Sequence, residues 1–280
     1  MGKIEEALKK ASGTNAGNVE EQGSLEAPNE KGTQKDFARA KSYVLPPEET
    51  ITRKPVDFRI VVYHNPESIA AEHFKSLRGQ IMHPADGRKI KSVLVTSALD
   101  QEGKTTVACN LAISIAQSLD PYVLLIDSDV RRPNVHTMLG LEKGKGLTDF
   151  LLGDVSLPTC LQKGPLDKMR VLQAGSTVRN PAELLTSQKT KDLLSEVRER
   201  YRDRFVIIDS PPINLAAETE ILANNVDAVI VVVRYGLTEK NALDEALSKI
   251  SEEKLLGIVF NGYEITPRRY SYYKKHYSYY

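Results

Sequence analysis

The stretch VLVTSALDQEGKTTVACNLA, residues 93–112, joins an apolar strand pattern to a helical pattern through a polar loop. The helix opens on Gly103-Lys104-Thr105, the second half of a phosphate-binding loop. Backbone N–H groups at the start of a helix favour phosphate oxygens, Lys104 adds a positive charge near the β and γ phosphates, and the Thr105 hydroxyl suits a magnesium ion. The stretch therefore predicts a nucleotide site between a strand and a helix.

The predicted nucleotide-binding residues are consecutive along the chain. They are Ala98, Leu99, Asp100, Gln101, Glu102, Gly103, Lys104, Thr105 and Thr106. Ala98 stands where the general pattern has its first glycine, so this loop keeps a single glycine. A Gly-Lys-Thr triplet also arises by chance, and its place between a strand and a helix is what favours the functional interpretation.

Outside this stretch, apolar runs alternate with helical patterns. The apolar runs cover residues 92–96, 122–126, 170–173, 205–208, 228–233 and 255–260. The helical patterns cover residues 66–82, 104–119, 181–201, 217–224 and 239–252. Uninterrupted Val, Ile and Leu strands that alternate with helices indicate a mostly parallel sheet covered on both faces. The predicted fold class is therefore doubly wound α/β.

A second motif, LLIDSDVRR, spans residues 124–132 at the end of the next predicted strand. Side chains two apart on an extended segment face the same way, so Asp127 and Asp129 converge, with Arg131 close behind. Two carboxylates beside a phosphate site suit Mg²⁺, which takes few protein oxygens and keeps waters. The alternative is a loop with an Asx turn and a helix cap.

A third motif, FVIIDSPP, spans residues 205–212 and places Asp209 at the end of a buried strand. Ligands of doubly wound sheets bind at the carboxyl ends of the strands. Asp209 alone could be a turn residue before two prolines. Together with the other two motifs, its position favours a ligand site over a simple turn.

The composition excludes several classes of protein. The 280 residues carry a formal charge of +1, so the whole chain gives no case for nucleic acid or an anionic membrane as the main partner. The two cysteines lie far apart without CxxC spacing, which fits a reducing cytoplasm. No apolar run approaches the roughly 20 residues of a membrane helix. We expect a short amphipathic helix at 1–11, a disordered linker at 12–55, a globular domain at 56–263 and a flexible tail at 264–280.

The tail ends in YSYYKKHYSYY, residues 270–280, which holds six of the chain's twelve tyrosines. The spacing matches neither a helical stripe nor a strand alternation. By itself the segment is open to three interpretations: a solvated low-complexity end, a stacking surface for single-stranded nucleic acid, or a set of hydroxyls for a phosphoryl donor.

The combination of a P-loop, hhhDxDxR, hhhDSPP and a tyrosine-rich tail resembles the bacterial tyrosine kinases of capsule and exopolysaccharide production, in which the three motifs are called Walker A, A′ and B. The resemblance runs from about residue 72 to 280. Its most specific elements are IDSDVRRP at 126–133, GL-DFLLGD at 146–154 and NPAELL at 180–185. The opening MGKIEEALKKA is similar to that of single-chain members. The resemblance implies a P-loop NTPase fold.

The resemblance also implies an ATP- and Mg²⁺-dependent protein-tyrosine autokinase that regulates exopolysaccharide polymerisation and export. Lys104 would act on the phosphates, Asp129 and Asp209 would help to hold the metal, and Asp127 would orient or deprotonate the incoming tyrosine. The phosphate acceptors would be Tyr270, Tyr272, Tyr273, Tyr277, Tyr279 and Tyr280. The 17 residues after Tyr263 span at most about 55 Å, enough to reach a neighbouring subunit, so we expect transfer in trans.

Members of this family carry an ExxRxxR signature used in ring-like self-association, and here Glu72, Lys75 and Arg78 occupy its places. Lysine keeps the charge but lacks the planar fork of arginine. The alternative is an ordinary charged helix face. The resemblance further implies an activator, a polysaccharide chain-length regulator in the inner membrane, which would hold this cytoplasmic protein at the inner face of the membrane.

Two departures from the family pattern bear on nucleotide binding. Family members usually have Pro-Gly where this chain has Asp100-Gln101, so a residue that tolerates positive φ is missing and a carboxylate lies near the phosphates.

The main alternative function is a nucleotide-switch ATPase of the chromosome-partitioning and septum-positioning kind, but those proteins have a second lysine where this chain has Leu99. A second alternative is a nucleic-acid or scaffold protein with an incidental ATPase.

Overall fold

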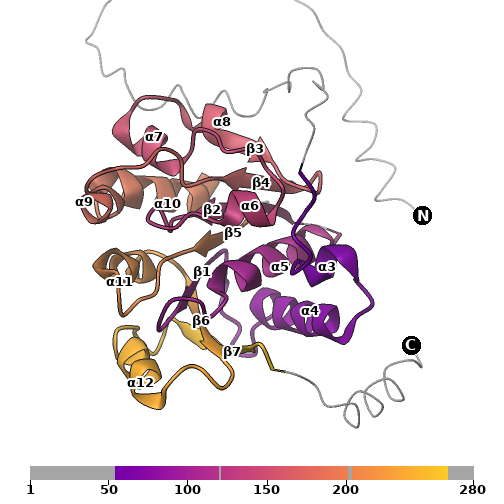
Figure 1. Cartoon of the computed structure of the whole chain (residues 1–280). Coiled ribbons are helices and arrows are strands. Elements are labelled where there is room, and N and C mark those ends of the chain that lie inside the picture. Colours follow the sequence, from indigo (N-terminus) through magenta and orange to yellow (C-terminus); the bar gives the residue numbers. More distant parts are fainter. Residues whose placement is uncertain (1–53, 120, 201–203, 264–280) are drawn as a thin grey trace, which may run out of the picture. The chain divides into compact units, whose positions relative to one another are not determined.

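The computed structural model describes residues 54–119, 121–200 and 204–263. Within these ranges seven strands form one sheet in the order β3-β4-β2-β5-β1-β6-β7 (Figure 1). The strands are β1 (Ser92–Ser97), β2 (Tyr122–Asp127), β3 (Leu161–Lys163), β4 (Met169–Leu172), β5 (Arg204–Asp209), β6 (Ala228–Arg234) and β7 (Leu255–Asn261). The predicted helix at 1–11, the tail at 264–280 and almost all of the predicted linker at 12–55 lie outside the described residues and stay predictions.

The sheet is parallel except at one edge. Strands β4, β2, β5, β1, β6 and β7 pair in parallel, and only the short β3 runs antiparallel, beside β4. Strand β1 lies between β5 and β6, so the chain moves outward from β1 in both directions, as in doubly wound folds. The predicted fold class is confirmed.

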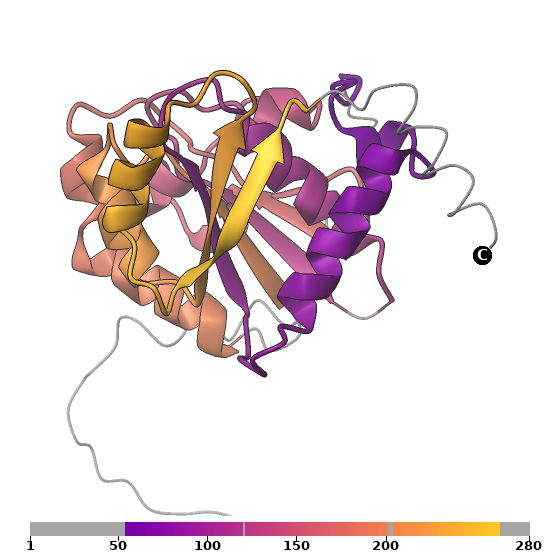
Figure 2. The ribbon, with the colours of Figure 1, turned by 90° about the horizontal axis from the view of Figure 1, so that it is seen from below.

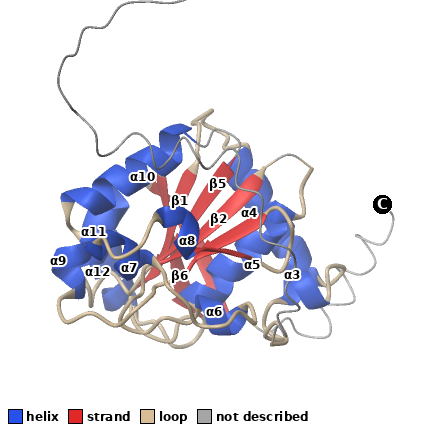
Figure 3. Cartoon of the chain, turned by 90° about the horizontal axis from the view of Figure 1, so that it is seen from above, coloured by secondary structure: helices blue, strands red, loops and turns tan. Residues whose placement is uncertain are grey.

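Helices cover both faces of the sheet. They are α3 (Val61–His64), α4 (Ile69–Met82), α5 (Lys104–Ala116), α6 (Val135–Met138), α7 (Leu147–Leu152), α8 (Leu157–Cys160), α9 (Pro181–Leu185), α10 (Gln188–Arg200), α11 (Ala217–Asn224) and α12 (Lys240–Ser248). Helices α4 and α5 lie on one face, and α10, α11 and α12 lie on the other (Figures 2 and 3). This two-sided cover explains why the central strands read as continuous apolar runs.

The main hydrophobic core lies between α5 and the sheet. All six residues of β1 are buried, and so is every residue of β2 after Tyr122. Helix α5 is buried at almost every position, because α3, α4 and α6 pack on it from outside. A helix that is buried on all sides cannot shift without opening the core. The loop that precedes α5 is therefore held at its carboxyl end by rigid structure.

Two local predictions differ from the structure. The helix expected at 181–201 is two helices, α9 and α10, which are separated at Thr186 and Ser187. The Ser187 hydroxyl lies 3.4 Å from the backbone nitrogen of Thr190, the position of a helix cap, which begins α10 separately. The antiparallel strand β3 was not predicted, because three half-buried residues carry no periodic signal.

None of the helices in the described ranges is long and apolar enough to cross a membrane. Both cysteines, Cys109 and Cys160, are buried free thiols.

Candidate active site

The three predicted motifs meet at the carboxyl ends of the central strands of the sheet. Strands β2, β5 and β1 are direct neighbours, and Asp127 at the end of β2 is paired with Asp209 at the end of β5. Residue Val95 of β1 also pairs with Asp209, so the loop that follows β1 starts beside both aspartates. The sequence predicted this convergence from the rule that the carboxyl ends of parallel strands share an edge.

The phosphate-binding loop runs from the end of β1 to the start of α5. Gly103 is the N-cap of α5 in a left-handed conformation, with φ of 93°, and α5 begins at Lys104. Gln101 also has a positive φ, 64°, and it is the single non-glycine residue with positive φ in the described ranges. The position where family members usually have glycine thus keeps the left-handed conformation, and glutamine adopts it at a steric cost of about 1–2 kcal/mol.

Lys104 points toward the acidic residues at the carboxyl ends of β2 and β5. Its Nζ lies 2.8 Å from Oδ2 of Asp129, and the two side chains are 13% and 4% exposed. Burial favours the neutral amine, but the charges of Asp209, Asp129 and Asp127 outweigh it and raise the pKa of Lys104. The lysine is therefore a firmly charged cation, held by Asp129 at the place where phosphate oxygens would compete for it.

Asp209 is a buried carboxylate with no satisfied oxygen. It is 0% exposed, and neither oxygen receives a hydrogen bond of ordinary geometry from the described residues. Burial raises the pKa of Asp209 to about 7, although the Lys104 charge and the Thr105 hydroxyl lower it. Buried orphan oxygens are rare and mark a site that awaits a partner.

Asp127 is also fully buried, and here the oxygens have partners. Oδ1 accepts from the backbone N–H of Asp129 at 3.2 Å, and Oδ2 accepts from the N–H groups of Asn134 and Val135 at 3.2 and 3.1 Å. Burial and the charge of Asp209 raise the pKa of Asp127 well above its usual range. Asp127 therefore shapes the loop between β2 and α6, and in this conformation its carboxylate is closed to solvent.

The residues present fit a magnesium ion that is completed by a nucleotide. Within the described ranges no group of three or more His, Cys, Asp or Glu could hold a metal ion. Magnesium needs few protein ligands and takes the others from waters and substrate phosphates. The unpartnered oxygens of Asp209, with Thr105 and Asp129 beside them, supply that small set of ligands.

Asp100 does not point freely into solvent. Its Oδ2 accepts from Nη1 of Arg132 at 2.6 Å, and the side chains are 34% and 70% exposed. This pair joins the phosphate-binding loop to the loop after β2. The guanidinium offsets the carboxylate that the sequence places near the phosphates.

Arg131 and Glu218 form another contact of the loop after β2. Nε of Arg131 donates to Oε1 of Glu218 at 2.9 Å. Glu218 lies in the first turn of α11 and is 1% exposed, and its second oxygen has no partner among the described residues. The pair fixes the loop that carries Asp129 against the element that follows Asp209.

The motif at 146–154 forms a local structure around Asp149. Its carboxylate accepts from the backbone N–H groups of Gly146 and Ser176, from the Ser176 hydroxyl and from Lys145. Although Asp149 is buried, these donors hold its pKa well below the usual range. The motif thus joins α7 to the segment after β4.

The candidate oligomerisation residues on α4 have partners within the chain. Nζ of Lys75 lies 2.5 Å from Oε1 of Glu72, and Nη1 of Arg78 donates to the backbone oxygen of Ser114 at 2.6 Å. Lys75 and Glu72 stay partly exposed, 35% and 45%, whereas the guanidinium of Arg78 is engaged by the chain itself. The predicted acceptor tyrosines, all within 270–280, lie outside the described residues.

Sequence reasoning missed three residues around the site. Arg132 pairs with Asp100, while Thr238 and Asn261 contact Glu102 of the phosphate-binding loop. Asn261 ends β7 at the same sheet edge, so the strand-end rule could have found it. No sequence signal marks Thr238, which lies in the connection between β6 and α12.

Comparisons with known proteins agree with this geometry. A family described as "AAA domain" matches residues 101–255. The tyrosine-protein kinase YwqD of Bacillus subtilis is 38% identical over 217 residues, which cover 76% of this chain and 90% of that protein.

Solved structures divide into kinases and more distant proteins. The kinase domain of Escherichia coli tyrosine kinase ETK superposes with a TM-score of 0.68 at 27% identity, covering 80% of this chain and 86% of that one. The septum site-determining protein MinD of Pyrococcus horikoshii, complexed with Mg-ADP, has a TM-score of 0.51 at 20% identity, covering 64% and 75%. This second likeness shows the fold alone. With its three motifs assembled at one sheet edge, the chain belongs to the family of bacterial tyrosine kinases and is a P-loop protein-tyrosine kinase.

Proposed function

We propose that the chain transfers the γ-phosphoryl group of ATP to the tyrosines of its own C-terminal cluster, and that transfer occurs in trans. The observation that carries the proposal is the charge arrangement at the sheet edge. Lys104 is held 2.8 Å from Asp129, beside the buried and unpartnered Asp209. A cation that can leave its carboxylate for a phosphate, next to carboxylates suited to a metal, is what phosphoryl transfer requires.

The residues have separate parts in this mechanism. Lys104 exchanges Asp129 for the β and γ phosphate oxygens, and the N–H groups at the start of α5 bind the same phosphates. Asp129, once released, would hold Mg²⁺ together with Thr105 and Asp209. When bound, Mg²⁺ neutralises charge on the transferred phosphoryl group. No covalent enzyme intermediate is needed, because positioning and charge neutralisation provide most of the rate.

Asp127 remains the candidate to orient or deprotonate the acceptor tyrosine. A phenol with a pKa near 10 is protonated at neutral pH, so a carboxylate within hydrogen-bond reach assists its attack. The carboxylate is closed to solvent by the backbone of Asp129, Asn134 and Val135. This role therefore requires the loop between β2 and α6 to open when substrate binds.

The place where the tail begins supports transfer in trans. Strand β7 ends at Asn261 on the same side of the sheet as the nucleotide loop, and 17 residues follow Tyr263. Fully extended, they span at most about 55 Å. Subunits in a ring would present such tails to neighbouring sites, with Glu72, Lys75 and Arg78 at the contact. The acceptors would be Tyr270, Tyr272, Tyr273, Tyr277, Tyr279 and Tyr280.

The biological setting is also part of the proposal. We infer a role in exopolysaccharide or capsule polymerisation and export, with a chain-length regulator of the inner membrane as activator. The chain would be cytoplasmic and peripheral at the membrane through that partner, without nucleic acid as a ligand. A relative in Staphylococcus aureus is named putative tyrosine-protein kinase CapB, and it is 29% identical over 76% of this chain.

A nucleotide-switch ATPase without kinase activity is the rival function. Its defining second lysine would stand at the position of Leu99, whose side chain here is a partly exposed apolar group. A tyrosine cluster has no role in that function. The likeness to MinD concerns the fold and leaves the kinase function favoured.

The test mixes two variants, each unable to label itself. Full-length Lys104→Ala provides tail tyrosines without a working site, and a chain ending at Tyr263 provides a site without a tail. With labelled ATP and Mg²⁺, and the cytoplasmic end of a candidate membrane regulator added, label should appear on tyrosines of the Lys104→Ala chain in the mixture alone. Lys240→Ala, which removes an exposed lysine of α12, should behave as wild type.

Two results would contradict the proposal. Wild-type protein that never carries phosphotyrosine with the activator present would refute the autokinase function. Label on wild-type protein but none in the mixture of the two variants would refute transfer in trans and leave the autokinase function standing. Hydrolysis of ATP stimulated by DNA or membranes, without phosphotyrosine, would favour the rival ATPase.

A further inference from the structure

Glu102 lies inside the phosphate-binding loop but faces away from solvent. It is 1% exposed, and both carboxylate oxygens have donors within the protein. Oε2 accepts from the backbone N–H of Leu99 at 2.7 Å, and Oε1 accepts from the hydroxyl of Thr238. A carboxylate that is already paired in this way is not free for a metal or a phosphate, so its role lies in the loop itself.

The bond from Leu99 to Glu102 closes the tip of the loop. The carbonyl oxygen of Leu99 accepts from the Ser97 hydroxyl at 2.7 Å, so both backbone groups of Leu99 are held by side chains. Gln101, with φ of 64°, lies within the short turn that the bond between Leu99 and Glu102 closes. A left-handed glutamine persists only where its surroundings hold it, and the Glu102 carboxylate provides that restraint.

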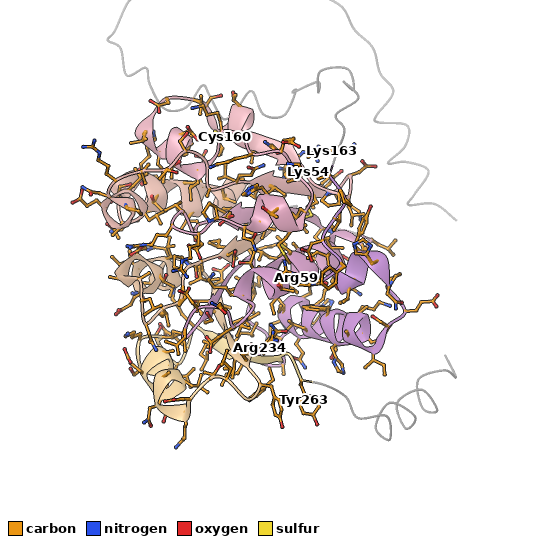
Figure 4. The ribbon with its side chains drawn as sticks, in the orientation of Figure 1. Lys54, Arg59, Cys160, Lys163, Arg234 and Tyr263 are labelled. Carbon is orange, nitrogen blue, oxygen red and sulfur yellow. The ribbon has the colours of Figure 1, made fainter. Side chains whose placement is uncertain are left out.

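Thr238 connects this carboxylate to the sheet. Its hydroxyl oxygen accepts from the backbone N–H of Arg234, the last residue of β6, at 2.9 Å, while its hydrogen is donated to Glu102. Asn261, the last residue of β7, donates from Nδ2 to the backbone oxygen of Glu102 at 2.9 Å. Figure 4 labels Arg234 and Tyr263 at this end of the sheet.

The approach of the loop to β7 is close. A Cβ atom built on Gly103 would lie 1.9 Å from Nδ2 of Asn261 and would need a left-handed φ of 93°, so a larger residue there would displace the Asn261 side chain and strain the backbone. The phosphate-binding loop therefore rests against the ends of β6 and β7 as well as following β1. We call Glu102, Thr238 and Asn261 the loop support.

We propose that Glu102 and Thr238 are positioning residues for nucleotide binding. They hold Leu99 and Gln101 in the conformation in which the loop receives phosphates, and they do so without contacting the phosphates. The inference rests on the proposed ATP site. It extends that site to a threonine in the connection between β6 and α12, 136 residues from Glu102 in the sequence.

The expected effect is on nucleotide affinity rather than on turnover. Without the Thr238 hydroxyl, Glu102 Oε1 and the Arg234 N–H lose their partners, and the loop spends less time in the competent conformation. The apparent dissociation constant rises by the inverse of the competent fraction. A lost hydrogen bond of this kind corresponds to a rise of roughly three- to tenfold in the Kd for ATP. Saturating ATP restores the competent loop, so kcat should change little.

The test compares three threonine variants of the full-length chain. Thr238→Val removes the hydroxyl at nearly constant volume, and Thr238→Ser retains it. Thr190→Val is the matched control, because the Thr190 hydroxyl donates to the carbonyl of Leu184 at 2.9 Å in a different part of the fold. We expect a weaker Kd for Thr238→Val alone, with Thr238→Ser near wild type. In a chain that already carries Glu102→Gln, Thr238→Val should raise the Kd for ATP by a smaller factor than it does alone, because both changes disrupt the same contact between Thr238 and Glu102.

A second measurement needs no nucleotide. Hydrogen exchange in the segment 98–103 should be faster in Thr238→Val than in wild type or Thr190→Val, because Glu102, which accepts from the Leu99 amide, is no longer held by Thr238. Equal exchange and equal Kd in the two valine variants, or full additivity with Glu102→Gln, would overturn the inference. If wild-type protein fails to bind ATP, the proposed function fails, and the exchange experiment still decides the role of the loop support.

Discussion

Replacing Asp209 by asparagine should stabilise the protein in the absence of metal and abolish its activity. Burial raises the pKa of this carboxyl from 3.8 to about 7. Between these two values the native state keeps a proton that the unfolded state releases. The contribution of Asp209 therefore makes the free energy of unfolding fall as the pH rises from about 4 to 7, and the full cost is present above pH 7.

The size of the effect follows from the shift. Three pKa units correspond to about 4 kcal/mol at 1.4 kcal/mol per unit. Asparagine has no charge to desolvate, and the attraction of Asp209 for Lys104 is already contained in the shift. The buried amide is itself left without hydrogen-bond partners, which offsets part of the gain. We expect a net stabilisation of about 2 kcal/mol at pH 8 and well under about 1 kcal/mol at pH 5.

Urea unfolding at several pH values, with EDTA present, measures this difference. Asp154→Asn, which changes an exposed carboxyl, is the control. Its free energy of unfolding should not move further from that of wild type as the pH rises. Mg²⁺ with a nucleotide should stabilise wild type and leave Asp209→Asn unchanged, because the variant lacks the metal ligand. A gap between wild type and Asp209→Asn that stays constant or narrows as the pH rises would refute the reasoning.

Two further predictions concern the unusual residues of the phosphate-binding loop. Gln101→Gly should raise the free energy of unfolding by about 0.5 kcal/mol, because the relief of positive φ exceeds the entropy that glycine gains in the unfolded chain. The same change at the exposed helical residue Gln80 should lower the free energy of unfolding by about 1 kcal/mol. Urea unfolding of the two variants measures both changes. Asp100→Asn should leave stability within about 0.5 kcal/mol, since its pair with Arg132 is partly exposed. Asp100→Asn should also tighten ATP binding, most strongly at low salt, because it removes a negative charge near the phosphates. Calorimetry at two salt concentrations measures the affinity, and a weaker affinity for the variant would contradict this prediction.

The strands of the fold could be predicted closely because each signal is local. Six of the seven strands coincide with apolar runs to within about two residues, since residues buried on both faces must be continuously apolar. The division between α9 and α10 was missed because a single serine cap is a weak signal inside a helical pattern. Strand β3 was missed because its pairing with β4, and not its composition, makes it a strand.

The candidate site was predictable to the level of which residues gather, but not which atoms they contact. The order of motifs along parallel strands was enough to bring Lys104, Asp129 and Asp209 together. The enclosure of Asp127 depends on how the loop after β2 turns back, and the pair of Asp100 with Arg132 depends on two loops from different strands. Contacts of this kind are long-range in sequence and carry no periodic pattern.

The sequence by itself determined the α/β fold class, the edge where the site forms and the residues that suit phosphate and magnesium. It could do so because strand periodicity and strand-end position are properties of short segments. Only the tertiary structure decided that Lys104 is held by Asp129, that Asp209 is left without a partner and that Thr238 reaches Glu102 across the fold. Hydrogen-bond partners are chosen by the packing of whole elements, because a buried polar group bonds to whatever donor the assembled chain places beside it.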